Sequence, residues 1–168
     1  MTNVNATKTK CTFIAHHRES DGQEQSVAEH LCGVAGYAEK FAAKLQLGKC
    51  GRLIGLVHDL GKYSTDFQSY LRSGVGLLNP DEDAYVDAGA LKGKIDHSTA
   101  GAQLIWQHLS SRGPIASLMG QILSLSVASH HSGLRDCLAP NGLDNFSRRM
   151  GKSTDKTHLD EAWSAVDK

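Results

Sequence analysis

The sequence lacks a long hydrophobic run and an excess of charge of either sign. No apolar stretch approaches the roughly 18–20 residues of a membrane span, so no membrane segment is predicted. Lysine and arginine together number 18, as do aspartate and glutamate. No overall basic field therefore exists to hold nucleic acid, and any such contact must be local. The polar start, Met1 to Lys10, lacks the apolar core of a secretion signal, and we expect a cytoplasmic protein.

Closely spaced cysteines are also missing. The four cysteines, Cys11, Cys32, Cys50 and Cys137, are far apart and form no C-x-x-C pair. Neither a zinc knuckle nor a redox-active pair is indicated, and we expect reduced thiols. Histidine, in contrast, is abundant, with nine residues in a chain that has two Trp, four Tyr and four Phe. The candidate chemistry therefore lies with histidine.

The length of 168 residues corresponds to one domain, or to one domain with a tail, at roughly 100–200 residues per domain. Hydrophobic residues make up 40% of the chain, which is enough for a core. We expect residues 1–12 to be a flexible N-terminal segment and residues 13–168 to form the folded domain.

Apolar residues recur at helical spacing, and no strand-like alternation of useful length is present. The first helix is expected to start at a capping box, Ser26 to Glu29, and to end at Gly48. The helix over 115–130 is the richest in apolar residues and should be the most buried. The fold class predicted is an all-α bundle of five or six helices, over residues 26–47, 52–60, 64–72, 100–109, 115–130 and 159–166.

Two ionisable residues, His58 and Asp59, lie within the apolar helix predicted over 52–60. A buried charge costs several kcal/mol unless it is paired or binds a metal, and a metal ion is the simplest partner. His30 follows the apolar face of the first helix, and three further histidines lie at helix ends. The candidate metal ligands are His30, His58, Asp59, His97, His130 and His131.

Imidazole nitrogens with a carboxylate oxygen suit transition metals such as Mn, Fe, Co, Ni or Zn better than calcium. More than three or four such ligands indicate two adjacent ions. Paired ions about 3.5–4 Å apart stabilise the attacking and leaving oxygens of a phosphoryl displacement. Lys62 follows Asp59 by three residues, and if the helix continues it could hold a phosphate oxygen.

Other histidines and cations have a simpler interpretation. His16 and His17 fit a polar turn, and His108 and His158 fit surface positions. The small basic group of Arg148, Arg149 and Lys152 fits a solvated face better than a contact to the DNA backbone.

The order of these motifs resembles the HD superfamily of metal-dependent phosphohydrolases. It is most similar to the HD nuclease domain of the CRISPR-associated type I helicase-nuclease. The motifs that carry the resemblance are His30, then H-D-L-G-K over 58–62, D-H-S-T-A-G over 96–101 and S-H-H-S-G over 129–133. The segments R-E-S-D-G-Q over 18–23 and G-L-L-N-P-D-E-D over 76–83 resemble subtype I-C members in particular.

This resemblance, from about Phe13 to the end, implies an HD-domain fold and a nuclease that hydrolyses phosphodiester bonds of single-stranded DNA in CRISPR interference. It implies one or two divalent ions, drawn from Mn, Ni, Co, Fe, Zn or Mg. It matches the metal-ligand positions to the six candidates above and makes Asp59 and Lys62 the catalytic residues. The implied partners are a helicase module, which follows on the same chain in the family, and a guide-RNA surveillance complex.

The sequence departs from the family pattern at one point. A further metal-binding aspartate is expected on a helix well past the two adjacent histidines, and Asp155, Asp160 and Asp167 are too close to match it. We therefore expect a nuclease domain cut before that helix and before the helicase. Two alternatives remain open, namely an HD phosphohydrolase acting on nucleotides and a catalytically incomplete fragment of a nuclease-helicase.

Overall fold

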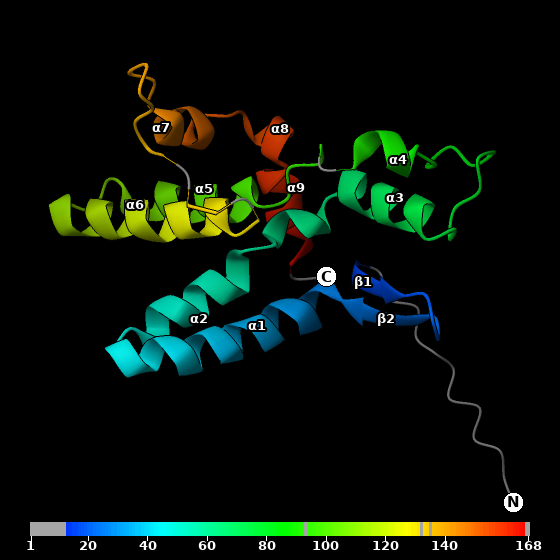
Figure 1. Ribbon diagram of the computed structural model, residues 1–168, viewed down its shortest axis with the longest axis horizontal. Coiled ribbons are helices and arrows are strands. Elements are labelled where there is room, and N and C mark those ends of the chain that lie inside the picture. The colour runs from blue at the N-terminus through cyan, green and yellow to red at the C-terminus, as the bar shows by residue number, and fades with distance from the viewer. Residues whose placement is uncertain (1–12, 93, 132, 135, 167–168) are drawn as a thin grey trace, which may run out of the picture.

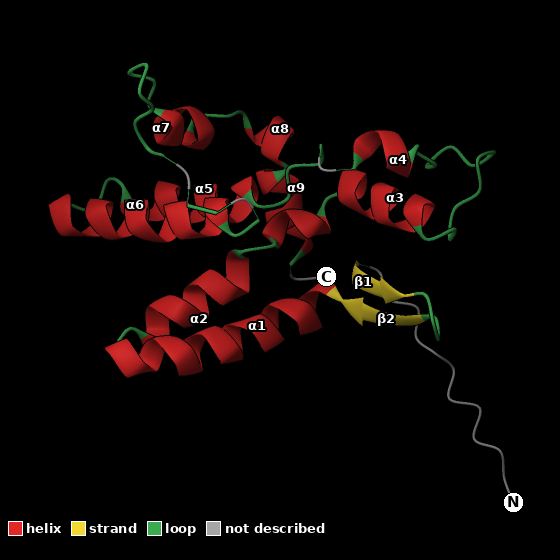
Figure 2. Cartoon of the chain, in the orientation of Figure 1, coloured by secondary structure: helices red, strands yellow, loops and turns green. Residues whose placement is uncertain are grey.

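A computed structural model describes residues 13–92, 94–131, 133–134 and 136–166, so the segment 1–12, expected to be flexible, lies outside the described residues. Within them the chain forms nine α-helices and one two-stranded sheet (Figures 1 and 2). The all-α prediction is thereby confirmed. The described part of the chain contains no helix with the length and apolar character that crossing a membrane requires.

The described part of the chain begins with a β-hairpin and continues with helices of very different length. The elements are β1 (Ile14–Arg18), β2 (Gln23–Ser26), α1 (Val27–Ala42), η1 (Ala43–Leu45), α2 (Gly48–Val57), η2 (Leu60–Tyr63), α3 (Thr65–Gly74), α4 (Ala88–Leu91), α5 (Thr99–Leu109), α6 (Pro114–Ser129), α7 (Asn145–Met150), α8 (Thr154–Thr157) and α9 (Leu159–Ala165), where η1 and η2 are 3-10 helices.

The capping box that starts α1 is present as predicted. The Ser26 hydroxyl accepts from the Glu29 amide, and the Glu29 carboxylate accepts from the Ser26 amide. The predicted end at Gly48 is wrong. The chain instead turns at Gln46, whose φ of 61° is left-handed, and Gly48 begins α2.

The hairpin of β1 and β2 was not predicted, because neither strand alternates apolar and polar residues. Ile14 and Ala15 are both buried, and β2 is the polar segment Q-E-Q-S. The turn between the strands is built by Asp21, which accepts from the Arg18 guanidinium and the Gln23 amide. Three helices of four to six residues, α4, α7 and α8, were also missed, since segments so short show no helical period.

The prediction that residues 115–130 form the most buried element is wrong. Helix α6 buries Leu123 and Val127, but Ile115, Leu118 and Ile122 are 81%, 58% and 49% exposed. The apolar content of a helix does not determine which of its sides are covered by neighbouring elements. In this fold the neighbours of α6 leave Ile115, Leu118 and Ile122 exposed.

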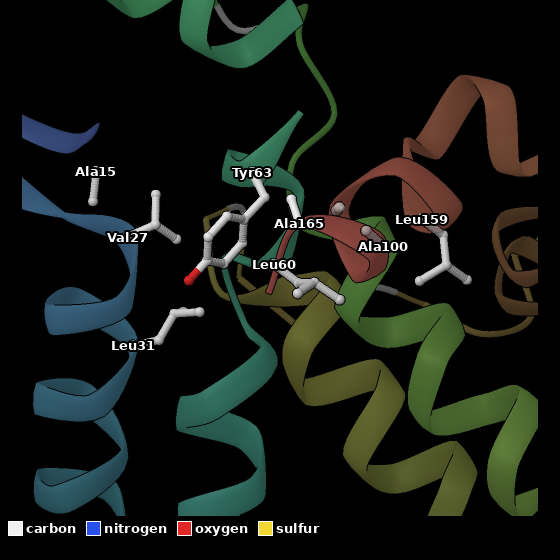
Figure 3. Packing of buried hydrophobic residues seen from close by; sticks show 9 residues of the cluster. Ala15, Val27, Leu31, Leu60, Tyr63, Ala100, Leu159 and Ala165 are labelled. Atoms are coloured by element: carbon white, nitrogen blue, oxygen red, sulfur yellow. The ribbon is translucent and has the colours of Figure 1, made fainter. Parts of the chain in front are cut away.

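Two helical pairs, α1 with α2 and α5 with α6, form the body of the fold, with η2 and α9 between them (Figure 1). Tyr63 of η2 lies in one core cluster between Leu31 of α1 and Ala165 of α9 (Figure 3). A second cluster joins Val57, Ile105 and other side chains of α2, α5, α6 and α7. The ends of α2 and α6 and the start of α5 therefore meet near the middle of the molecule.

Candidate metal centre

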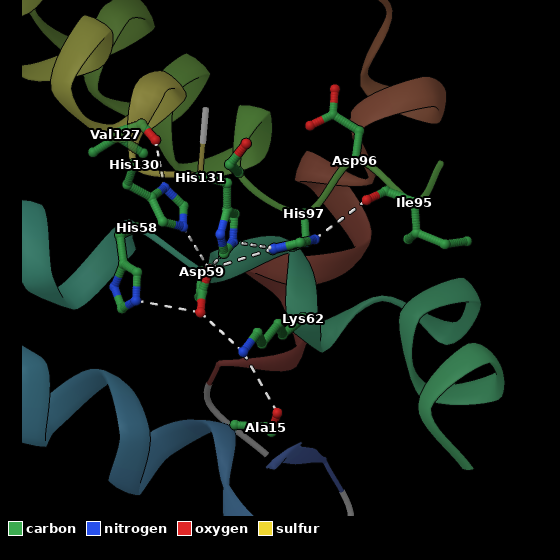
Figure 4. Close-up of polar contacts among 12 residues, drawn as sticks. Ala15, His58, Asp59, Lys62, Ile95, Asp96, His97, Val127, His130 and His131 are labelled. Carbon is green, nitrogen blue, oxygen red and sulfur yellow. Dashed lines mark hydrogen bonds and ion pairs between the residues drawn. The ribbon is translucent and has the colours of Figure 1, made fainter. Parts of the chain in front are cut away.

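All six predicted metal ligands lie within one site, although they come from four separate helical regions. Figure 4 shows His58, Asp59, His97, His130 and His131 around this site. His30 belongs to α1, and the pair His58 and Asp59 follows α2. His97 lies directly before Ser98, the N-cap of α5, and His130 and His131 directly follow α6.

His58 and Asp59 do not continue a helix, contrary to the prediction of one helix over 52–60. His58 is the C-cap of α2, and its amide donates to Ile54. Asp59, with φ −114° and ψ 26°, leaves the helix before η2 begins. This break turns the carboxylate toward the centre of the bundle. Had the helix continued, the side chains of His58 and Asp59 would have pointed about 100° apart around its axis.

His97 reaches the site because its backbone passes very close to Gly61. The Gly61 amide donates to the His97 carbonyl at 3.0 Å. A Cβ on Gly61 would lie 2.6 Å from the His97 Cα and carbonyl oxygen, which is closer than real contacts allow. The glycine in the H-D-L-G-K motif therefore permits the approach of the histidine loop.

The Asp59 carboxylate lies between two groups of histidines, one at each oxygen. On one side, Oδ2 is 3.0 Å from His30 Nε2 and 3.2 Å from His58 Nε2. On the other side, Oδ1 is 3.1 Å from His130 Nε2, 3.7 Å from His97 Nε2 and 3.8 Å from His131 Nε2. A carboxylate in this position can share its two oxygens between two cations.

The ring orientations fit metal ligands. A backbone carbonyl accepts from Nδ1 of His58 at 2.9 Å, of His97 at 3.2 Å and of His130 at 2.7 Å. Because a carbonyl only accepts, each Nδ1 carries its proton, and in a neutral ring Nε2 holds a lone pair. This second contact is the usual arrangement for metal-bound histidine.

The lone pairs then face other acceptors across short distances. His97 Nε2 and His131 Nε2 are 2.7 Å apart, and both face the Asp59 oxygen. The lone pair on His97 and the Asp59 carboxylate repel one another unless a cation, or a proton such as one on His131, lies between them. The donor set therefore fits a divalent ion, and the residues divide into two groups, Asp59 with His97, His130 and His131, and Asp59 with His30 and His58.

Asp59 stays ionised despite its burial. Its side chain is 4% exposed. Burial alone would raise its pKa. Contacts to His130, His30 and His58, in which a protonated ring donates from Nε2, and the nearby Lys62 charge instead hold the pKa far below its usual range. A full negative charge is thus available at the centre of the site.

The histidines on the open side of the site differ in protonation. Burial lowers the pKa of His97, and burial together with the neighbouring His130 lowers that of His131. Burial also opposes protonation of His130, but the hydrogen bond to Asp59 raises its pKa overall. The His131 side chain is 56% exposed, so the Oδ1 side of Asp59 faces solvent.

Lys62 lies in the site as the H-D-L-G-K spacing predicted, although η2 rather than an α-helix carries it. Its Nζ is 3.0 Å from Asp59 Oδ2 and 3.4 Å from the Ala15 carbonyl. Its side chain is 7% exposed, so the ammonium is held among the ligands.

His16, which the sequence interpretation placed in a polar turn without a role, also borders the site. Its Nε2 is 3.4 Å from Lys62 Nζ, and its ring centroid is 4.7 Å from that of His30. Strand β1 brings it there, and since the hairpin itself was not predicted, no signal in the sequence could have placed it.

His158 is another correction, because it is not a surface residue. Its side chain is 17% exposed. The residue lies between α8 and α9 and has a left-handed backbone conformation, with φ of 58°. Its ring nitrogens lie 3.6 Å from Asp66 and 3.7 Å from Glu161, and neither of these residues is a candidate ligand. Asp155 and Asp160 belong to neither metal-capable group among the described residues, and Asp167 lies outside those residues.

The comparisons with known proteins identify one family. The family model described as "Cas3, HD domain" matches residues 13–168. No curated protein matches the chain.

Proposed function

This chain belongs to the Cas3 HD-domain family, a CRISPR-associated family of HD nucleases, and on that premise we propose that it is a metal-dependent nuclease acting on single-stranded DNA. The proposed reaction is hydrolysis of phosphodiester bonds. The proposed ligands are Asp59 and the five histidines gathered around its carboxylate, namely His30, His58, His97, His130 and His131.

One observation carries this proposal. The two oxygens of Asp59 face two different histidine groups, at distances of 3.0–3.2 Å on one side and 3.1–3.8 Å on the other. A carboxylate shared between two ions is what a two-metal phosphodiesterase needs at its centre. Two divalent ions, when bound, supply Lewis acidity and lower the pKa of a water molecule.

The residues of the chain have separate roles in this proposal. Asp59 and the histidines fix the positions of the ions, and the carbonyl contacts at Nδ1 hold the rings in the orientation that binds metal. Lys62 offsets negative charge on the scissile phosphate from the Oδ2 side. His131, exposed at the Oδ1 side, marks where the phosphate enters.

The surroundings of the centre favour a polymer over a free nucleotide. A cavity of about 1280 Å³ opens beside His97 and His131, and lysine and arginine side chains line it. A nucleotide phosphohydrolase needs a closed pocket with residues that recognise the base, whereas this cavity is open. A helicase module and a guide-RNA surveillance complex in the cytoplasm remain the proposed partners and setting.

The experiment is cleavage of circular single-stranded DNA by this chain with Mn, Ni, Co or Mg, with EDTA as the metal-free control. Nicking should require metal and should be lost in Asp59→Ala. The matched control Asp81→Ala, which removes an exposed loop carboxylate, should retain it.

Other outcomes would overturn the proposal. Hydrolysis of free nucleotides without cleavage of DNA would indicate the small-molecule phosphohydrolase. Metal binding without either activity would indicate a catalytically incomplete site.

A further inference from the structure

Lysine and arginine side chains gather in the cavity beside the metal centre. We name this surface the basic groove and define it by Lys92, Lys94, Arg148, Arg149 and Lys152. It is continuous with the centre, because His97 and His131 line the same cavity.

The charge in the basic groove is a local feature of a neutral chain. Lysine and arginine equal aspartate and glutamate over the whole sequence, at 18 each. Among the described residues that line the groove, there are five cations and two carboxylates, Asp96 and Asp136. A concave surface with an excess of positive charge attracts a polyanion even where the net charge of the protein does not.

The five cations fall into two sets. Lys152 Nζ is 2.7 Å from Asp96, and Arg149 lies 3.6 Å from Asp96 while donating to Ser98 and Thr99. These two hold the loop that carries His97. The other three, Lys92, Lys94 and Arg148, are exposed, and none of them forms an ion pair within the described ranges.

An aromatic side chain lies in the same groove. Tyr70 of α3 lines the cavity and is half-buried. Its ring centroid is 6.1 Å from that of Phe67, which in turn is 5.3 Å from the ring of His97. The rings therefore lead from the basic groove to the metal centre, and a ring beside a row of cations is the usual pattern of a single-strand binding surface.

We propose that the basic groove binds the single-stranded DNA that the metal centre cleaves. Lys92, Lys94 and Arg148 contact consecutive phosphates of the backbone, and Tyr70 stacks on a base. Arg149 and Lys152 instead position the His97 loop through Asp96. The identity of the ligand rests on the proposed nuclease function, while the groove itself rests on the charges and rings described above.

Binding of a short fluorescein-labelled single-stranded oligonucleotide tests the inference. We would measure anisotropy with the full chain in EDTA, so that no cleavage occurs and the result does not depend on nuclease activity. The groove variant combines Lys92→Ala, Lys94→Ala and Arg148→Ala. The matched control combines Lys40→Ala, Lys44→Ala and Lys49→Ala, which removes three exposed cations at the far end of α1 and α2 (Figure 1).

The salt dependence gives the expected size of the effect. Each phosphate contact on a single strand contributes about 0.7 to the slope of log affinity against log salt, so the groove variant should show a slope shallower by about 2. Between about 50 and about 200 mM salt, the wild type should then lose about 20-fold more affinity than the groove variant. The control should behave as the wild type.

Two further variants separate specific contacts from general effects. Tyr70→Ala should weaken binding about tenfold with an unchanged salt slope, and Tyr70→Phe should restore it. Exchanging Lys92 and Lys94 for arginine and Arg148 for lysine should retain the wild-type slope, because the charges remain.

Several outcomes would overturn the inference. They are a wild type that does not bind, a groove variant with the wild-type affinity and slope, and a control variant that weakens binding equally. Binding through the groove by a chain that cleaves no DNA would support the inference and contradict the nuclease proposal. Cleavage with no effect of the groove variant on binding would do the reverse.

Discussion

Gly101 of α5 lies directly against the carbonyl of Val57, the last residue of α2. A Cβ built on Gly101 would be 1.8 Å from the Val57 oxygen and 2.7 Å from its carbonyl carbon. Both atoms belong to backbone, so no side-chain rotation relieves the contact. Since His58 follows Val57 and His97 precedes α5, this close approach helps to set the distance between two sides of the metal centre.

Gly101→Ala should therefore destabilise the fold. Overpacking of a tight core contact costs about 1–3 kcal/mol or more, and here the backbone of α2 or α5 has to move. Urea unfolding would give the change in the free energy of unfolding.

Gly33→Ala in α1 is the matched control for this prediction. Nothing lies within 4 Å of a Cβ there, so the same substitution should stabilise α1 by about 0.5–1 kcal/mol. Equal effects at the two positions would show that helix propensity, and not the Val57 contact, governs Gly101.

The shared carboxylate makes a prediction about metal stoichiometry. If Asp59 holds both ions, Asp59→Asn should lower the occupancy of both, because each oxygen belongs to one group. His30→Ala removes a ligand from the Oδ2 group and should lose one ion, while His97→Ala should lose the ion on the Oδ1 side. Elemental analysis after dialysis against metal, together with isothermal titration calorimetry, measures the number of ions bound per chain.

His108→Ala, which removes an exposed histidine of α5, is the control for that experiment and should leave this number unchanged. A wild type that binds a single ion, lost equally in His30→Ala and His97→Ala, would contradict the two-group arrangement.

The sequence predicts the long helices, and it singles out residues that the structure gathers at one site, for physical reasons that individual residues show. The hydrogen bonds between Ser26 and Glu29 fix the start of α1 and thereby the position of His30. These bonds are local in the sequence, so the sequence alone predicts them. The family motifs single out the remaining candidate ligands, and the structure gathers their side chains around Asp59.

Non-local relationships could not be predicted. His16 joins the site through a hairpin whose strands lack alternation, and the exposure of Ile115 depends on which neighbours cover α6. The turn at Asp59 depends on the approach of the His97 loop to Gly61, a contact between residues 36 positions apart in the sequence. Periodicity within a segment carries no information about such contacts.

The loop that carries His97 is tied to the C-terminal helices by Asp96. Its carboxylate accepts from Lys152 Nζ at 2.7 Å and from the Thr99 hydroxyl at 2.7 Å, with Arg149 at 3.6 Å. Burial alone would raise the pKa of Asp96, but these hydrogen bonds and charges lower it. The ion pair therefore links α7 and the segment after it to the loop of His97, a proposed metal ligand.

Asp96→Asn should make the free energy of unfolding less dependent on pH in the acid range. Because the folded pKa of Asp96 lies below its unfolded value of about 3.9, the carboxylate contributes stability above that value. The contribution is lost as the pH falls through the lower, folded pKa. At neutral pH the variant should be less stable by about 1–3 kcal/mol, the usual range for a hydrogen bond to a charged group. Urea unfolding of both proteins over a series of pH values should show this gap narrowing toward acid, whereas Asp81→Asn in the exposed loop should show no gap. A gap that stays constant down to acid pH would mean that Asp96 acts through its shape rather than its charge.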